Sequence, residues 1–255
     1  MNLAAIMQPT FFPWMGYFDI IDQVDIFVFY DNVQLTKRSW QVRNRIKMAS
    51  GEYFLTVPVK KTKNRDELMI CDAEICYEQH WQAKHLKNIE INYKKSAHFN
   101  EVFGLISEIY GKKHNLLYSF NEDFIINVLK RIGITTTLVQ SHELGEVEGV
   151  KDARLAAICK KIGCGDYLSP QGSSNYIEAV SPGGELVRQG IALYYQHYVH
   201  PVYHQLYGSF HGYLGIIDLL FNEGFDNALG IIRSGRHEKI PFMDFRTKYL
   251  KLENQ

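Results

Sequence analysis

The chain has 255 residues, and its 28 Lys and Arg residues balance its 28 Asp and Glu residues, so the formal net charge is zero. General nucleic-acid binding rests on an excess of positive charge, so we do not expect a general polyanion binder. No apolar run approaches about 18 residues, and the start lacks a charged segment followed by an apolar core. The sequence therefore predicts a cytoplasmic protein with neither a membrane span nor a signal peptide.

The first thirty residues have the pattern strand, loop, helix, strand. Leu3 to Met7 and Ile26 to Tyr30 are short apolar runs, and apolar residues recur at helical spacing over 14–23. An open α/β sheet begins in this way, and the loops after its strands form the ligand crevice. We interpret the first loop as a pocket wall, and the alternative is an aromatic plug over the core. Its candidate binding residues are Gln8, Thr10, Trp14 and Tyr17.

A second polar segment follows the second strand. Asp31 and Gln34 come directly after it, and a basic strip occupies 37–47. Arginine grips phosphate or carboxylate with two hydrogen bonds, and tryptophan stacks on planar rings. The strip therefore predicts contacts to a nucleotide or sugar-nucleotide phosphate, with a plain solvated surface as the alternative. The residues concerned are Trp40, Arg43, Asn44, Arg45 and Lys47.

The middle of the chain changes from strands to helices. Strands are expected near 53–59 and 69–75, with basic loops between the early strands. Residues 78–132 have the spacing of three amphipathic helices, and Gly133 is a plausible C-terminal cap. We predict a single domain over 1–255 in which 78–132 is a helical insertion or subdomain. The fold class is α/β, a Rossmann-like open and mostly parallel sheet.

The α/β alternation resumes after residue 134. Strands are expected over 135–141, 166–169 and 191–197, with helices over 151–162 and 210–222. The loop over 169–175 is rich in small and amide residues that suit an anion or sugar hydroxyls, although a simple turn explains it equally well. The candidate binding residues here are Arg154, Ser169, Gly172 and Tyr176.

Cysteine and histidine groups invite a metal interpretation that their spacing weakens. Cys71/Cys76 and Cys159/Cys164 are each five residues apart, which misses the usual doublet. His197, His200 and His204 likewise lack a standard ligand spacing, so we predict no metal. We instead expect His200 in the crevice as a proton acceptor, beside Tyr203 and Gln205, because histidine titrates near neutral pH.

Several segments together resemble the WbqC-like family. The residues that carry the resemblance lie at 7–18 (Met-Gln-Pro-Thr-Phe-Phe-Pro-Trp-Met-Gly-Tyr-Phe), 30–34, 39–47, 55–60, 167–176, 200–205 and 217–222. The resemblance covers nearly the whole chain, and the motifs occur in order. It implies a role in the biosynthesis of bacterial O-antigen, the lipopolysaccharide side chain, or of another surface polysaccharide.

Together these features predict a transferase that modifies a nucleotide-linked amino sugar, by amide-forming acyl or aminoacyl transfer. The basic strip would hold the phosphates, and His200 or Asp31 would accept the proton. No cofactor follows with certainty from the sequence, and the expected donor is an acyl-CoA or an aminoacyl group.

Three alternatives stay open. One is a nucleotidylyltransferase-like enzyme, and a second is a non-catalytic sugar-nucleotide binding protein. The third is an aminoacyl-tRNA-dependent transferase, in which loops at 37–47 and 60–65 would meet tRNA. The sequence also allows a homo-oligomer.

Overall fold

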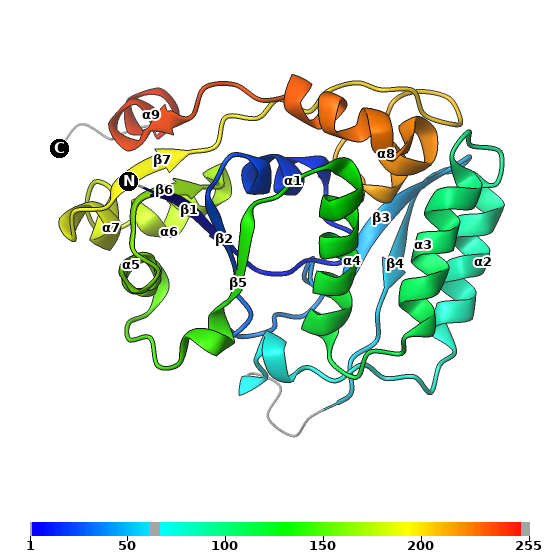
Figure 1. The fold of residues 1–255 in the computed structure, drawn as a ribbon, viewed down its shortest axis with the longest axis horizontal. Coiled ribbons are helices and arrows are strands. Elements are labelled where there is room, and N and C mark those ends of the chain that lie inside the picture. Colours follow the sequence, from blue (N-terminus) through cyan, green and yellow to red (C-terminus); the bar gives the residue numbers. More distant parts are fainter. Residues whose placement is uncertain (1, 62–66, 251–255) are drawn as a thin grey trace.

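The computed structural model describes residues 2–61 and 67–250, so part of the basic loop at 60–65 lies outside the described residues. At its centre is an open six-stranded sheet in the order β5-β2-β1-β6-β7-β8 (Figure 1). Every neighbouring pair is parallel except β7 with β8. This confirms the predicted Rossmann-like α/β class. The strands are β1 (Asn2–Met7), β2 (Ile26–Phe29), β5 (Thr137–Gln140), β6 (Cys164–Ser169), β7 (Ala192–Tyr195) and β8 (Ile240–Pro241).

Helices cover both faces of this sheet. Phe27 and Phe29 of β2 join a large core with α1 to α4 and α8, whereas Val28 joins a smaller core with α5, α6, α7 and α9. Strand side chains alternate between faces, so each face has its own apolar set. The helices are α1 (Met15–Asp22), α2 (Trp81–Tyr93), α3 (Phe99–Gly111), α4 (Leu117–Ile132), α5 (Lys151–Lys161), α6 (Ser174–Ile177), α7 (Gly184–Arg188), α8 (Ile217–Ser234) and α9 (Phe242–Tyr249).

The helical zone packs against the rest of the chain. Helices α2, α3 and α4 stand side by side at one end of the molecule (Figure 1). Their buried side chains belong to the same core as those of β2 and α8. The assignment of 78–132 as an insertion within one domain stays a prediction, and this shared core supports it. Gly133 ends α4 with φ 85°, as predicted for a C-terminal cap.

A second, two-stranded antiparallel sheet consists of β3 (Arg43–Met48) and β4 (Gly51–Thr56). The basic strip at 37–47, predicted as a loop, therefore contains a strand. Asn44 and Ile46 are buried on one face of β3, and the alternate residues Arg43 and Arg45 are partly exposed, whereas Lys47 on the arginine side is also buried. The charges obscure this pattern in the sequence, because they occupy every second position.

Two further predictions about secondary structure are wrong. The segment 69–75, predicted as a strand, contains the 3₁₀-helix η2 (Ile70–Asp72), since the Ala73 N–H donates to the Ile70 carbonyl at 3.3 Å. The helix predicted over 210–222 begins only at Ile217. Side chains elsewhere bond to the carbonyl groups before it, at 209–213, so these carbonyls cannot accept the bonds of a helix.

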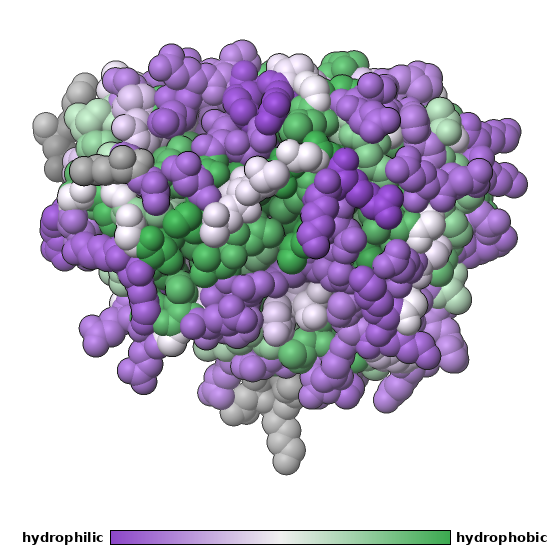
Figure 2. Space-filling model, viewed as in Figure 1, coloured by the Kyte–Doolittle hydropathy of each residue, from purple (hydrophilic) through white to green (hydrophobic). Residues whose placement is uncertain are grey.

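The surface of the molecule has both apolar and hydrophilic regions. Figure 2 shows a band of apolar side chains across the middle of the viewed face, with hydrophilic side chains around it. No helix among the described residues is both long and apolar enough to cross a bilayer.

A kink in α8 gives a test of the packing. Gly224 has φ 76° and ψ 175°, and a Cβ there would lie 2.5 Å from Nδ1 of His98. We expect Gly224→Ala to lower the free energy of unfolding by about 2 kcal/mol, because it adds backbone strain and a clash. Gly230→Ala in the same helix is the control: its Cβ would meet nothing within 4 Å, and alanine is expected to stabilise by up to about 1 kcal/mol. If urea unfolding shows that both variants lose the same free energy of unfolding, this account is contradicted.

Candidate functional site

A crevice opens at the carboxyl end of β1, where the strand order reverses between β1 and β6. In open parallel sheets this switch point is the usual ligand site. Two cavities meet here, because both are lined by Met7 and Thr10. The Trp14 cavity, of about 280 Å³, is also lined by Trp14, Tyr17, Trp40, Asn44, Arg45 and Tyr213. The Tyr176 cavity, of about 510 Å³, is also lined by Ile6, Gln8, Tyr30, Val33, Gln41, Lys151, Leu155, Pro170, Ser173 and Tyr176.

Buried asparagines hold the crevice loop in place. Asn44 Nδ2 donates to the carbonyls of Phe11 and Phe12, at 3.1 and 2.8 Å. Asn121 Nδ2 of α4 donates to the carbonyls of Pro9 and Gln41, at 3.1 and 2.9 Å. These loop carbonyls take no part in the backbone hydrogen bonds of any described strand or helix, and these side-chain bonds satisfy them. The bonds therefore fix the shape of the crevice wall.

One cation lies in the Trp14 cavity. Arg45 forms a 2.8 Å salt bridge with Glu52 and donates from Nη2 to the Tyr213 carbonyl, also at 2.8 Å. Its guanidinium lies over the Trp40 ring, 5.7 Å from the centroid. Its Nε is buried and has no hydrogen-bond partner among the described residues. Two exposed aromatic side chains, Trp40 and Tyr213, line the same cavity as Arg45.

The opposite end of the crevice is also cationic. Lys151, the first residue of α5, lines the Tyr176 cavity. Arg154, one turn later, lies over the Tyr30 ring at 5.9 Å, and its buried Nε also lacks a partner in the described chain. A helix N-terminus adds positive potential at this point, which favours an anion.

An aspartate–histidine pair stands at the neighbouring strand ends. Asp31, fully buried, follows β2, and Ser141 and His142 follow β5, the strand paired with β2. The Asp31 carboxylate accepts bonds from Ser141 Oγ at 2.8 Å, from the His142 backbone N–H at 3.1 Å and from His142 Nδ1. The His142 side chain is 30% exposed. The Nδ1 bond fixes the tautomer of a neutral ring, and Nε2 then remains a proton acceptor.

A buried carboxyl group lies close to this pair. Burial, and then the charges of Asp31 and Glu143, raise the pKa of Glu122 from its ordinary 4.5 to about 8, while a bond from Gln140 opposes the rise. Its Oε1 has no partner among the described residues. Glu122 also adds to the effect of burial in raising the pKa of Tyr17, which lines the Trp14 cavity. Glu122 is therefore a neutral acid at pH 7, near both the crevice and Asp31.

We call these groups the acid–base cluster. Tyr118, one turn before Glu122, completes it, with its ring 5.1 Å from that of His142 in an edge-on arrangement. The members are Asp31, Tyr118, Glu122, Ser141 and His142.

The structure gathers many of the predicted binding residues at the crevice. Trp14 and Trp40 form its aromatic walls, and Arg154 lies beside it over Tyr30. The predicted residues that line it are Gln8, Thr10, Trp14, Tyr17, Trp40, Asn44, Arg45 and Tyr176. Their role as substrate contacts stays a prediction.

Three predicted residues instead surround a buried carboxylate. Asp218 accepts bonds from Tyr203 at 2.8 Å and from Gln205 Nε2 at 2.7 Å, and also from Tyr93. Lys47 Nζ donates to Gln205 Oε1 at 3.0 Å. Because Lys47 is linked through Gln205 to Asp218, this group fastens β3 to α8, whatever its further role.

The remaining predicted residues are dispersed. His200 packs behind the crevice wall, its ring 6.1 Å from that of Trp14 and its Nδ1 2.9 Å from the Pro201 carbonyl oxygen. Burial lowers the pKa of His200, which favours the neutral ring. Gln34 bridges to Met69. Arg43 lines a separate cavity, described below. Ser169 is buried at the end of β6, and Gly172 lies in the short helix after it.

Four residues of the site were not predicted from the sequence: His142, Glu122, Tyr118 and Lys151. The signal for His142 was present, because it directly follows the strand predicted over 135–141, just as Asp31 follows the second strand. Glu122 gave no signal, since its raised pKa depends on burial against segments distant in sequence.

Comparisons with known proteins agree with the motifs. Residues 8–229 match the model of the WbqC-like protein family. The chain is 34% identical over 228 residues to the uncharacterized protein Rv1507c of Mycobacterium tuberculosis (strain ATCC 25618 / H37Rv), covering 88% of this chain and 95% of that protein. No solved structure matches the chain.

The Glu122 carboxyl predicts a pH-dependent stability. The folded state holds its proton up to about pH 8, whereas the unfolded chain releases it near pH 4.5. Stability from this group is therefore complete below pH 4.5 and is lost as pH rises to 8. We expect Glu122→Gln to match wild type at pH 5 and to be more stable at pH 9, measured by urea unfolding. The control is Glu148→Gln, an exposed residue whose charge is not among those that raise the pKa of Glu122, and it should follow the wild-type curve. A constant offset between Glu122→Gln and wild type would contradict the assignment.

Proposed function

The chain belongs to the WbqC-like protein family, and on that premise we propose that it is a transferase acting on a nucleotide-linked amino sugar in surface-polysaccharide biosynthesis. The reaction is amide-forming acyl or aminoacyl transfer, carried out in the cytoplasm. The observation that carries the proposal is the crevice at the switch point, with aromatic walls, a cation at each end and an aspartate–histidine pair at the adjacent strand ends.

The crevice has the groups that such a substrate needs. Lys151, Arg154 and the start of α5 bind the nucleotide phosphates, since this end combines two cations with the positive end of a helix. The sugar lies toward Thr10 and Trp14, because aromatic rings pack on sugar faces. The amides of Gln8 and Gln41, which bond to each other, orient hydroxyl groups.

The acid–base cluster handles the proton. The amine nitrogen attacks the acyl carbonyl carbon, a C–N bond forms, and the bond to the leaving group breaks. His142 Nε2 takes the proton from the amine and passes it to the leaving group, while Asp31 stabilises the imidazolium. Glu122 is neutral at pH 7, so it adds no second negative charge beside Asp31. We place the base at His142 rather than His200, because only the former has a carboxylate partner.

Binding tests the crevice first. We expect a UDP- or dTDP-linked amino sugar to raise the melting temperature of the protein, and Lys151→Ala to weaken its binding by about tenfold, because a charge-assisted contact to phosphate is lost. Lys160→Ala is the matched control, an exposed lysine in the same helix that lines neither cavity. Affinities from isothermal titration that are equal for both variants would place the nucleotide elsewhere.

Turnover tests the base. With a responsive sugar and donor identified, His142→Gln should lower the rate of amide formation by about 10²- to 10⁴-fold while sugar-nucleotide affinity stays the same. Mass spectrometry of the product measures this rate. His237→Gln, an exposed histidine outside the crevice, is the control. If His200→Gln abolishes the rate and His142→Gln does not, the base is His200.

A further inference from the structure

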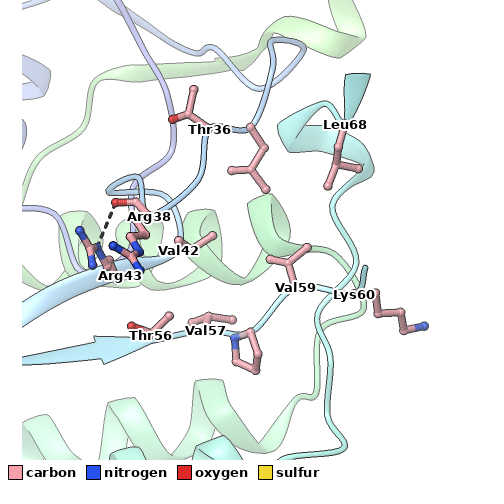
Figure 3. A pocket seen from close by; sticks show the side chains of 11 residues that line it. Thr36, Arg38, Val42, Arg43, Thr56, Val57, Val59, Lys60 and Leu68 are labelled. Atoms are coloured by element: carbon pink, nitrogen blue, oxygen red, sulfur yellow. Dashed lines mark hydrogen bonds between the residues drawn. The ribbon is translucent and has the colours of Figure 1, made fainter. Parts of the chain in front are cut away.

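A third cavity shares no lining residue with the crevice and has no role in the proposed binding of the sugar. It has a volume of about 350 Å³ and lies between the segment 35–43 and the chain leaving β4 (Figure 3). Apolar side chains, among them Val42, Val57 and Leu68, form its middle, and Arg38 and Arg43 lie together at one end. We call it the arginine trough.

The two arginines at this end have no carboxylate partner among residues 2–61 and 67–250. Arg43 Nε donates to the Arg38 carbonyl at 3.0 Å, and its guanidinium lies 4.5 Å from the centroid of the Phe54 ring. No salt bridge to either arginine occurs in the described part of the chain, whereas Lys60 at the rim pairs with Glu74. Figure 3 shows the Lys60 side chain directed away from the cavity. A fixed guanidinium without an acidic partner suits a phosphate.

An aromatic platform lies next to these arginines. The rings of Trp40 and Phe54 are stacked, with centroids 6.3 Å apart, and the two residues are 50% and 41% exposed. Arg43 joins the platform to the trough, since it contacts Phe54 and lines the cavity. Exposed aromatic rings interleaved with arginine are the features with which proteins stack a nucleotide base and hold its phosphate.

The short segment 31–35 connects the trough to the acid–base cluster. The N–H groups of Leu35, Ile70 and Cys71 donate to the carbonyls of Leu68, Val33 and Asp31, at 2.7, 2.9 and 2.9 Å. This pairing joins Leu35 and Leu68, which line the trough, to Asp31. Four residues of extended chain span at most about 13 Å. Leu68 lies at the opposite end of the trough from the arginines (Figure 3), so the trough leads from the arginines toward the Asp31 end of this segment.

We propose that the arginine trough and the Trp40–Phe54 platform bind the acyl donor of the transfer, an acyl thioester carried on a phosphorylated nucleotide. The base stacks on the platform, the phosphates bind Arg38 and Arg43, and the arm with its thioester lies along the apolar floor. In the reaction the amine attacks the thioester carbonyl, the C–N bond forms, the C–S bond breaks, and the thiol leaves with the proton that His142 took from the amine. This inference rests on the proposed function for the reaction, but the binding site is independent of it.

The test uses acetyl-CoA as the probe in isothermal titration of the full chain. We expect Arg43→Gln to weaken the binding of acetyl-CoA by at least about tenfold, because a charged hydrogen bond to phosphate is lost. Trp40→Ala should weaken it by about five- to a hundredfold, because base stacking is lost. The matched control is Lys37→Gln, an exposed neighbour of Arg38 that does not line the trough; its affinity should stay within twofold of wild type.

Four results would overturn the inference. Acetyl-CoA binding that neither Arg43→Gln nor Trp40→Ala weakens would show that the donor binds elsewhere. If Lys151→Ala is the only variant that loses acetyl-CoA binding, the donor binds in the crevice instead of the trough. Equal affinity for inorganic phosphate would reduce the trough to a general anion site. Binding of a charged tRNA but not of acetyl-CoA, with steep salt dependence, would replace the small donor by RNA.

Parallel titrations with the amino-sugar nucleotide separate this inference from the proposed function. Arg43→Gln should leave sugar-nucleotide affinity unchanged, and Lys151→Ala should leave acetyl-CoA affinity unchanged. If the sugar nucleotide fails to bind while acetyl-CoA binds as described, the trough stands and the proposed acceptor is wrong. If only the sugar nucleotide binds, the crevice stands and the donor site is wrong.

Discussion

The crevice depends on satisfying the carbonyl groups of the loop between β1 and α1. Pro9 and Pro13 lack an N–H group, and the loop pairs with no strand, so its buried carbonyls need donors from outside. Asn44 and Asn121 supply three of these bonds, Tyr17 Oη donates to the Gln8 carbonyl at 3.2 Å, and the Ile216 N–H donates to the Pro13 carbonyl at 2.8 Å. These donors come from α1, β3, α4 and the start of α8. The pocket wall is therefore complete only when segments from most of the chain have packed together, and loss of either asparagine would leave buried carbonyls unpaired.

The sequence predicted the parts of this arrangement that follow from local pattern. The apolar runs of β1 and β2 and the helical periodicity of α4 identify the sheet and its cover, and the rule that ligands bind at carboxyl ends of strands points to Trp14 and Asp31. The same reasoning treats Arg43, Arg45 and Lys47 as one phosphate grip. In the structure they share a strand face, but residues two apart are about 6.6 Å apart along a strand. They consequently meet the arginine trough, the crevice and Asp218, three surroundings that only the tertiary structure defines.

Asp218 shows why polar motif residues are hard to assign from sequence. A buried carboxylate is costly unless several donors meet it, and here Tyr93, Tyr203 and Gln205 do so. In the sequence, Tyr203 and Gln205 have the same chemistry as residues that bind a sugar hydroxyl. Burial distinguishes the two roles, because these side chains direct their polar atoms at Asp218. Glu122 is the opposite case. It lies in an ordinary amphipathic helix, yet its Oε1 is buried without a partner in the described chain, so it is a candidate for function.

Two arginines with a nitrogen that is unpaired in the described chain flank the crevice. Elsewhere in the chain arginines pair with carboxylates, as Arg236 does with Asp19 and Asp22. Among the described arginines, those with a buried and unpartnered Nε are Arg45 and Arg154, which stand at the two ends of the crevice. Leaving such a donor buried without an acceptor costs about 1–3 kcal/mol, more for a charged group. Two such donors, one on each side of the crevice, support the proposal that a ligand supplies the missing acceptors, as the oxygen atoms of a phosphate-bearing sugar would.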